Sequence, residues 1–149
     1  MNRFVRVGAA AGVFVTVLAV GYAVAADADS GYRADPVPGP GLVTVEIDIE
    51  HSAFSLDRLE VHAGSTVRFV VHNGDPILHE FVTGDASVHA RHEQGSEARH
   101  PPVPGEVSVD PGHTGVTFYE FDEPGTYEFA CHLPGHLAYG MVGEIEVVP

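Results

Sequence analysis

From residue 42 onward, apolar and polar side chains alternate with a period of two. The clearest case is residues 43–49, where four β-branched apolar residues occupy every second position and Thr, Glu and Asp lie between them. Such alternation predicts a β-strand with one buried face. Shorter apolar segments predict further strands at residues 67–71, 78–83, 107–109, 116–121, 126–130 and 142–148.

Turn-forming residues separate these segments, with Gly and Pro gathered at residues 73–76, 110–112 and 123–125. Between residues 42 and 149 we find no convincing helical periodicity. Seven or more short strands with closely spaced turns indicate an all-β fold, an antiparallel β-sandwich. We expect the bulk of its core to come from Phe69, Phe81, Phe118, Phe121, Tyr127 and Phe129.

A His-rich insert at residues 84–105 interrupts this pattern. Only two of its residues are both bulky and apolar, whereas charged residues and histidines are frequent. At this length the insert is either a functional loop or a disordered excursion. For its histidines we favour a solvated loop, and the alternative is a metal-capture site made of His89, His92 and His100.

The first 26 residues have the features of an export segment. Two arginines precede an apolar run over residues 7–26, and residues 24–26 form an acceptable small-residue cleavage site. The run is also near the roughly 20 residues that span a bilayer, so the segment is predicted to be a signal peptide or an N-terminal membrane anchor. Both outcomes place the remainder outside the cytoplasm, whether periplasmic, extracellular or anchored to the outer face of the membrane. Residues 27–41, rich in proline and glycine, predict a linker.

The chain is acidic, with seven cationic and 21 acidic residues among 149 and a formal net charge of −14. Because phosphate binding needs a basic surface, this balance argues against nucleic acid as a partner. It favours partners with cationic or neutral surfaces.

The single cysteine lies in the segment with the most informative chemistry, residues 131–141. One cysteine cannot form an internal disulfide, and metal ligation explains it best in an exported protein. Cys131, His136 and Met141 follow one another at five-residue intervals in a loop that contains Gly and Pro. Two imidazoles, one thiolate and a weak axial thioether are the ligands of a mononuclear copper electron-transfer site. Such a site needs one more histidine from elsewhere in the chain.

His79 is the best candidate for that ligand. It follows the turn at residues 73–76 and opens a predicted strand, so its ring can point into the rim of the sandwich. His72 is the runner-up, but it ends a strand on an alternating face and has no supporting pattern.

Residues 129–131, followed by His136 and Met141 and preceded well upstream by His79, resemble the cupredoxin family of blue copper proteins. Similar patterns occur in the plastocyanin and azurin group and in auracyanin- and rusticyanin-like proteins. The resemblance covers residues 42–149 and implies a Greek-key β-sandwich, the cupredoxin domain. It also implies one type 1 copper ion bound by His79, Cys131, His136 and Met141.

The resemblance further implies how electrons and partners reach the site. In this family the exposed edge of the C-terminal histidine ligand is the usual route for electrons. Here that residue is His136, and its apolar neighbours imply a docking patch for a redox protein partner, made of Leu133, Pro134, Leu137 and Ala138.

Two positions of the sequence differ from the motifs of related copper proteins, one from cupredoxins and one from multicopper oxidases. Many cupredoxins have Asn after the first histidine ligand, where it hydrogen-bonds to the cysteine loop, but this chain has Glu80. The pair Cys131–His132 resembles a ligand motif of multicopper oxidases, which need a His-Cys-His triplet. Because position 130 is alanine, oxygen reduction is not expected, and His132 is expected to point away from the copper.

Two functions fit these features. The first is an exported, monomeric carrier that cycles one copper ion between redox partners by single electrons and is not an enzyme. The second is an exported copper-binding protein for copper resistance or delivery. A closed four-ligand site favours the carrier, whereas the His-rich insert favours the alternative.

Overall fold

The structure is a computed structural model that describes residues 39–95, 99 and 102–149. The predicted export segment and most of the predicted linker lie outside these residues, as does His100 of the insert. Within the described part of the chain, no helix is long and apolar enough to cross a membrane.

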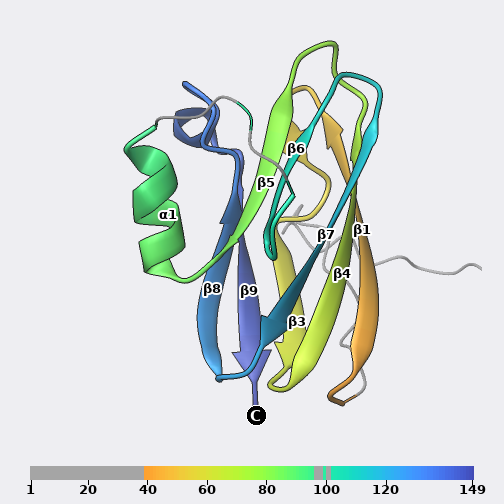
Figure 1. Ribbon diagram of the computed structural model, residues 1–149, viewed down its shortest axis with the longest axis vertical. Helices are drawn as coiled ribbons and strands as arrows, with labels where there is room; N and C mark the ends of the chain where they lie inside the picture. Colours follow the sequence, from red (N-terminus) through yellow and green to blue (C-terminus); the bar gives the residue numbers. More distant parts are fainter. Residues whose placement is uncertain (1–38, 96–98, 100–101) are drawn as a thin grey trace, which may run out of the picture.

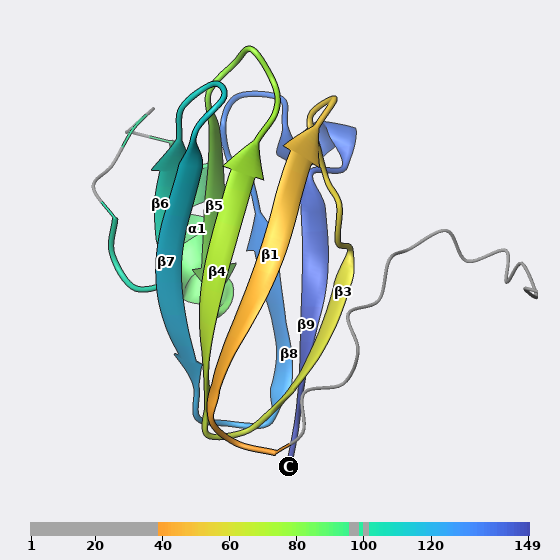
Figure 2. The same cartoon turned by 90° about the vertical axis from the view of Figure 1, so that its right-hand side faces the viewer.

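In the described residues, nine strands form two sheets that pack face to face (Figures 1 and 2). The first sheet has the order β2-β1-β4-β7, which comprises Ala53–Phe54, Leu42–Glu50, Ser65–Asn73 and Thr114–Phe121. The second has the order β3-β9-β8-β5-β6, which comprises Arg58–His62, Val142–Val148, Gly125–Ala130, His79–Gly84 and Glu106–Val109. The predicted β-sandwich is confirmed.

The strand pairing is mixed and not antiparallel throughout. β1 pairs in parallel with β4, and β3 pairs in parallel with β9. The other strand pairs are antiparallel. Because a hairpin cannot join two parallel neighbours, the chain crosses to the other sheet through β3 on its way from β1 to β4.

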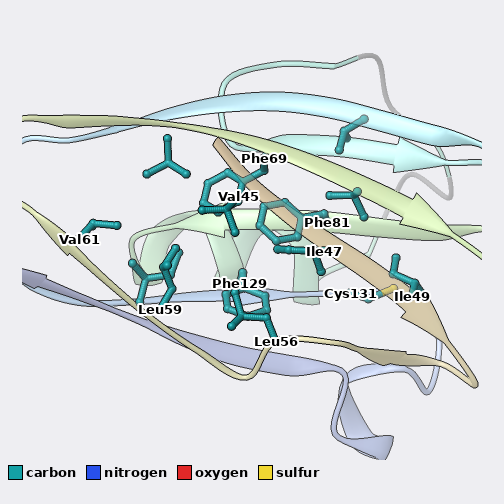
Figure 3. Close-up of a cluster of buried hydrophobic side chains, with 14 of the residues drawn as sticks. Val45, Ile47, Ile49, Leu56, Leu59, Val61, Phe69, Phe81, Phe129 and Cys131 are labelled. Carbon is teal, nitrogen blue, oxygen red and sulfur yellow. The ribbon is translucent and has the colours of Figure 1, made fainter. Parts of the chain in front are cut away.

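The core lies between the sheets and is filled by alternate residues of the strands. In β1, every second residue from Val45 to Ile49 is buried, and those between them face solvent. Phe81 of β5 stacks on Phe129 of β8 with 5.5 Å between the ring centroids. Figure 3 shows these rings within the core, and the Cys131 sulfur towards one end of the same cluster.

One predicted core residue, Phe118, lies on the surface, where 46% of it is exposed. β7 alternates like the other strands, and its inward face carries Thr117 and Phe121, which are buried. Phe118 occupies the intervening solvent-facing position, so the prediction for this residue was wrong.

The first half of the His-rich insert is a helix, α1 (Ala86–Glu93), and not a loop. Asp85 caps it, because its carboxylate accepts hydrogen bonds from the Ser87 N–H at 2.8 Å and the Val88 N–H at 3.1 Å. The helix packs on β5 and β8 at the outside of the sandwich (Figure 1). Its buried residue is His89 and not a large aliphatic side chain, so it lacks the apolar periodicity that identifies helices in a sequence.

The loops of one end of the sandwich surround the predicted copper ligands. The β8–β9 connection lies at this end with its short 3₁₀ helix (Leu137–Tyr139), next to the turn between β1 and β2 and the turn between β4 and β5 (Figure 2). The C-terminus lies at the opposite end (Figure 2).

Candidate metal centre

Cys131 directly follows β8 and is fully buried. Its backbone N–H donates to the Met141 carbonyl at 3.1 Å, which joins the two ends of the β8–β9 loop. Burial raises the pKa of the Cys131 thiol to about 11, although the backbone N–H groups of Glu80 and Leu133 oppose this rise. At neutral pH the metal-free site therefore holds a neutral thiol, whose proton a metal ion must displace.

His136 lies within the same loop, immediately before the 3₁₀ helix. Its Nδ1 is 3.1 Å from Cys131 Sγ, and its carbonyl accepts a hydrogen bond from the Met141 N–H at 3.1 Å. Gly140 ends the 3₁₀ helix with a φ of 92°, a left-handed conformation that favours glycine and lets the chain turn into β9. His136 is partly exposed, whereas Met141 is fully buried.

His79 opens β5, where it pairs with Val109 of β6, and its side chain is fully buried. Its Nε2 lies 3.0 Å from Asp75 Oδ2, and its buried Nδ1 has no hydrogen-bond partner. Since an ionised carboxylate can only accept, the Nε2 atom carries the proton and Nδ1 presents a lone pair. Burial lowers the pKa of His79, although the hydrogen bond with Asp75 opposes this shift, so the ring is neutral and able to bind a metal.

Asp75 is a site residue that the sequence pattern does not identify. Its carboxylate also accepts hydrogen bonds from the backbone N–H groups of His51 and Ser52, both at 2.7 Å. Burial alone would raise the pKa of Asp75, but these two hydrogen bonds and the one with His79 lower it below its ordinary value. Asp75 therefore fixes the tautomer and orientation of the His79 ring and ties it to the β1–β2 turn.

The ligand atoms of His79, Cys131 and His136 lie within 4.8 Å of one another, although they come from two distant parts of the sequence. The buried Nδ1 of His79 has no protein partner and so is available to a metal ion. A thiol with two imidazoles is the donor set that copper–thiolate sites use. These residues therefore fit copper, and Met141 belongs to the same buried cluster as Cys131.

His72, the other histidine considered for the first ligand, does not join this group. Its Nδ1 lies 2.8 Å from the hydroxyl oxygen of Thr114, on the neighbouring strand β7. The structure thus brings His79, and not His72, to Cys131.

Glu80 makes the cross-link that Asn makes in many cupredoxins. Its buried carboxylate accepts a hydrogen bond from the His132 backbone N–H at 2.8 Å, which joins β5 to the cysteine loop. The substitution of Asn by Glu therefore preserves the connection and replaces a neutral amide with an acidic group beside the thiol.

His132 directs its ring towards α1, where its Nε2 lies 2.9 Å from His89 Nδ1. Burial lowers the pKa of His132 to about 4, and the neighbouring His89 and His92 act in the same direction. His132 is therefore neutral at physiological pH.

The fold and the three-donor cluster define a copper-binding cupredoxin. The family model of copper binding proteins of the plastocyanin/azurin family matches residues 42–148, and the chain belongs to this family. Copper is its cofactor, as predicted from the sequence.

Two similar proteins are copper-resistant cuproproteins named CopI. The one from Rubrivivax gelatinosus is 36% identical over 125 residues, which cover 81% of this chain and 76% of the relative. The one from Pseudomonas aeruginosa is 31% identical, and the match covers 71% of this chain and 76% of the relative. Among solved structures, auracyanin A, a blue copper protein of Chloroflexus aurantiacus, superposes with a TM-score of 0.57 at 26% identity, covering 71% of this chain and 98% of that one.

Proposed function

We propose that this protein holds one copper ion in a type 1 site and carries single electrons between redox partners outside the cytoplasm. The observation that carries the proposal is the buried cluster of His79, Cys131 and His136, in which one imidazole nitrogen has no protein partner. When bound, copper supplies reversible one-electron chemistry between its cuprous and cupric states.

The protein's own contribution is a site that moves little during that cycle. Cys131 is held at the end of β8, and His79 is held by β5 and Asp75. Met141, buried directly before β9, is the proposed fourth and weak axial ligand. With four ligands no position is left open for a substrate, which is why we infer a carrier and not an enzyme.

Electrons would enter and leave through the partly exposed ring of His136. Its exposed and half-exposed apolar neighbours, Leu133, Pro134, Leu137 and Ala138, supply a docking surface for a redox protein. Hydrophobic contact around an exposed ligand brings a partner's cofactor close without the need for a deep cleft.

Paired alanine variants test the ligand assignment. His79→Ala should abolish the thiolate-to-copper visible band and reversible one-electron voltammetry, because it removes the buried donor. His72→Ala should leave both intact, because His72 bonds only to Thr114 on the outer side of β4. Loss of the band in His72→Ala with its retention in His79→Ala would contradict the assignment.

The second candidate function is copper resistance. The similarity to two copper-resistant cuproproteins, each spanning more than two thirds of this chain, favours it. A buried thiolate site could serve resistance by holding copper or by transferring its electrons in a copper-handling system.

Copper exchange and copper tolerance distinguish the two roles. A carrier should keep its copper against a competing chelator for many redox cycles, and a strain that lacks it should grow normally in copper. Rapid copper loss together with a copper-sensitive deletion strain would support the resistance role instead.

A further inference from the structure

The β1–β2 turn lies at the same end of the sandwich as the ligand loop and has an unusual backbone (Figure 2). Glu50 pairs with Ala53, so His51 and Ser52 alone form the turn. Their φ angles are 55° and 56°, and two positive φ angles in a two-residue hairpin loop are typical of a type I′ turn. Such turns favour Asn and Gly, and histidine tolerates this left-handed region better than serine does. Ser52 is therefore held in a conformation that serine does not favour by itself.

Asp75 of the β4–β5 turn holds both residues there. Its Oδ1 accepts the His51 N–H and its Oδ2 accepts the Ser52 N–H, both at 2.7 Å. The same Oδ2 atom lies 3.0 Å from His79 Nε2, which donates to it. The Ser52 N–H and the His79 ring therefore meet on one oxygen atom. Only 12% of the Asp75 side chain is exposed, so water does not readily replace these donors.

Asn73 fixes the β4–β5 turn from its other side. Its Oδ1 accepts the Asp75 N–H at 2.9 Å, and its Nδ2 donates to the carbonyls of Ile77 at 2.8 Å and Val109 at 2.9 Å. With the backbone of Asp75 fixed in this way, its carboxylate can move only by rotation of its own side chain. The two N–H groups of the β1–β2 turn oppose that rotation.

The orientation of the His79 ring depends on this carboxylate. Nε2 is hydrogen-bonded to Asp75, whereas Nδ1 has no hydrogen-bond partner among the described residues. Movement of Asp75 Oδ2 would therefore turn the ring and shift the Nδ1 lone pair relative to the other two donors. The ligand atoms of His79, Cys131 and His136 lie within 4.8 Å of one another, so a small rotation would change their geometry.

We propose that the β1–β2 turn is a positioning element for His79 and that Ser52 is its central residue. The inference rests on the proposed type 1 site. The left-handed turn places the Ser52 N–H where it fixes Asp75 Oδ2, and this oxygen orients the His79 ring before copper binds. Because such coupling is reciprocal, a change that favours the left-handed turn strengthens copper binding, and a change that opposes it weakens copper binding.

Two substitutions at position 52 keep the backbone N–H and alter the left-handed preference in opposite directions. Ser52→Gly favours a positive φ, whereas the β-branched side chain of Ser52→Val opposes it. We expect Ser52→Val to bind copper about tenfold more weakly than the parent, the lower end of the usual effect of disturbing a partner of a ligating histidine. Ser52→Gly should bind at least as tightly as the parent. Competition with a chelator of known affinity measures both.

Gly64→Val is the matched control, because it strains the backbone away from the site. Gly64 has a φ of 80° in the turn between β3 and β4, at the opposite end of the sandwich (Figure 2). A Cβ atom there would meet only the Pro40 side chain, at 3.5 Å, so the substitution adds strain without a close contact. It should lower the urea midpoint of the metal-free protein, as Ser52→Val does, but leave copper affinity unchanged.

Nitrogen NMR of the metal-free protein measures the same coupling without copper. In the parent, Ser52→Gly and Gly64→Val we expect His79 to show the Nε2–H tautomer, with a proton that exchanges slowly with water. Ser52→Val should exchange this proton faster, and Ser52→Thr, a smaller β-branched change, should do so too if Ser52→Val folds poorly.

The NMR result does not depend on a visible band, so it separates failure of the positioning role from failure of the proposed type 1 function. Equal copper affinity and equal Nε2–H exchange in Ser52→Gly and the β-branched variants would overturn the proposal. Equal loss of copper affinity in Gly64→Val would overturn it as well.

Discussion

Asp75 links His79, the proposed first copper ligand, to the rest of the molecule. It holds the Nε2 proton of His79 and is itself held by two backbone N–H groups of the β1–β2 turn. Asp75→Asn removes the charge of this side chain and keeps its shape. It tests whether Asp75 positions His79, because the single amide oxygen of Asn cannot accept all three hydrogen bonds.

We therefore predict that Asp75→Asn keeps the visible band but binds copper about 10–100-fold more weakly, the usual effect of changing a partner of a ligating histidine. Competition with a chelator of known affinity measures this change. Asp122→Asn is the matched control and should bind normally, because it alters an exposed carboxylate in the turn between β7 and β8, and this turn lies at the opposite end of the sandwich from the ligand loop (Figure 2). Equal affinities of the two variants would contradict a positioning role for Asp75.

The buried thiol makes copper binding dependent on pH. Burial raises the pKa of Cys131 to about 11, so the thiol is protonated at pH 7 to 9 and the metal must displace that proton. Between these pH values we predict one proton released per copper from this residue and an apparent affinity that rises about tenfold per pH unit. Calorimetry in buffers of different ionisation enthalpy measures the release, and an affinity independent of pH over this range would argue against it.

At the residue scale, the sequence identified the three donors because their chemistry and spacing are specific. Asp75 escaped detection because an Asp in an Asn-Gly-Asp-Pro segment is explained by turn formation alone. The one sequence feature that relates Asp75 to the site is its position four residues before His79. Glu80 was noticed as a departure, but its hydrogen bond to the cysteine loop depends on tertiary structure.

At the scale of secondary structure, β8 and β9 hold both ends of the ligand loop. Ala130 pairs with Val142, and Phe129 pairs with Gly143, directly beside the loop. A Cβ atom added at Gly143 would lie only 2.1 Å from the Phe129 ring, so the close approach of this ring to β9 requires glycine.

Gly143→Ala should therefore destabilise the metal-free protein by about 1–3 kcal/mol, the usual range for overpacking, and also weaken copper binding. Urea unfolding measures the stability change. Glu144→Gln, at a half-exposed position of the same strand, removes only a solvent-accessible ion pair with Arg58 at 3.4 Å and should stay within about 0.5 kcal/mol of the parent. A neutral effect of Gly143→Ala would show that the ring moves aside at little cost.

Strands with strict alternation were predictable, whereas α1 was not. Its sequence gives little apolar periodicity because His89 provides the buried contact, and the contacts that stabilise it come from β5 and β8. The capping residue Asp85 was the one local signal. Neither β2 nor β3 was predicted. The two-residue strand β2 is too short to show a pattern, whereas the alternation of Leu59 and Val61 in β3 could have been recognised.

At the scale of the whole molecule, the net negative charge governs how readily two copies of the protein approach each other. A formal net charge of −14 makes two copies repel each other, although the proposed docking patch around His136 is apolar. Raising the salt concentration from about 10 mM to about 150 mM shortens the screening length from about 30 Å to about 8 Å.

Electron self-exchange between reduced and oxidised copies should accelerate several-fold over that salt range, as measured by NMR line broadening. Leu137→Glu should slow the exchange, because it places a charge in the patch. Phe118→Glu adds the same charge on the exposed face of β7 and should have a smaller effect. Equal slowing by both variants would count against docking at His136.

The central claim is that His79, Cys131 and His136, with Met141, hold one copper ion through a thiolate. The visible and EPR spectra of the copper-loaded protein test it most directly. We predict an intense thiolate-to-copper band and a cupric EPR signal from one ion, both of which disappear in Cys131→Ser. A colourless cupric protein, or a band unchanged in Cys131→Ser, would contradict the claim.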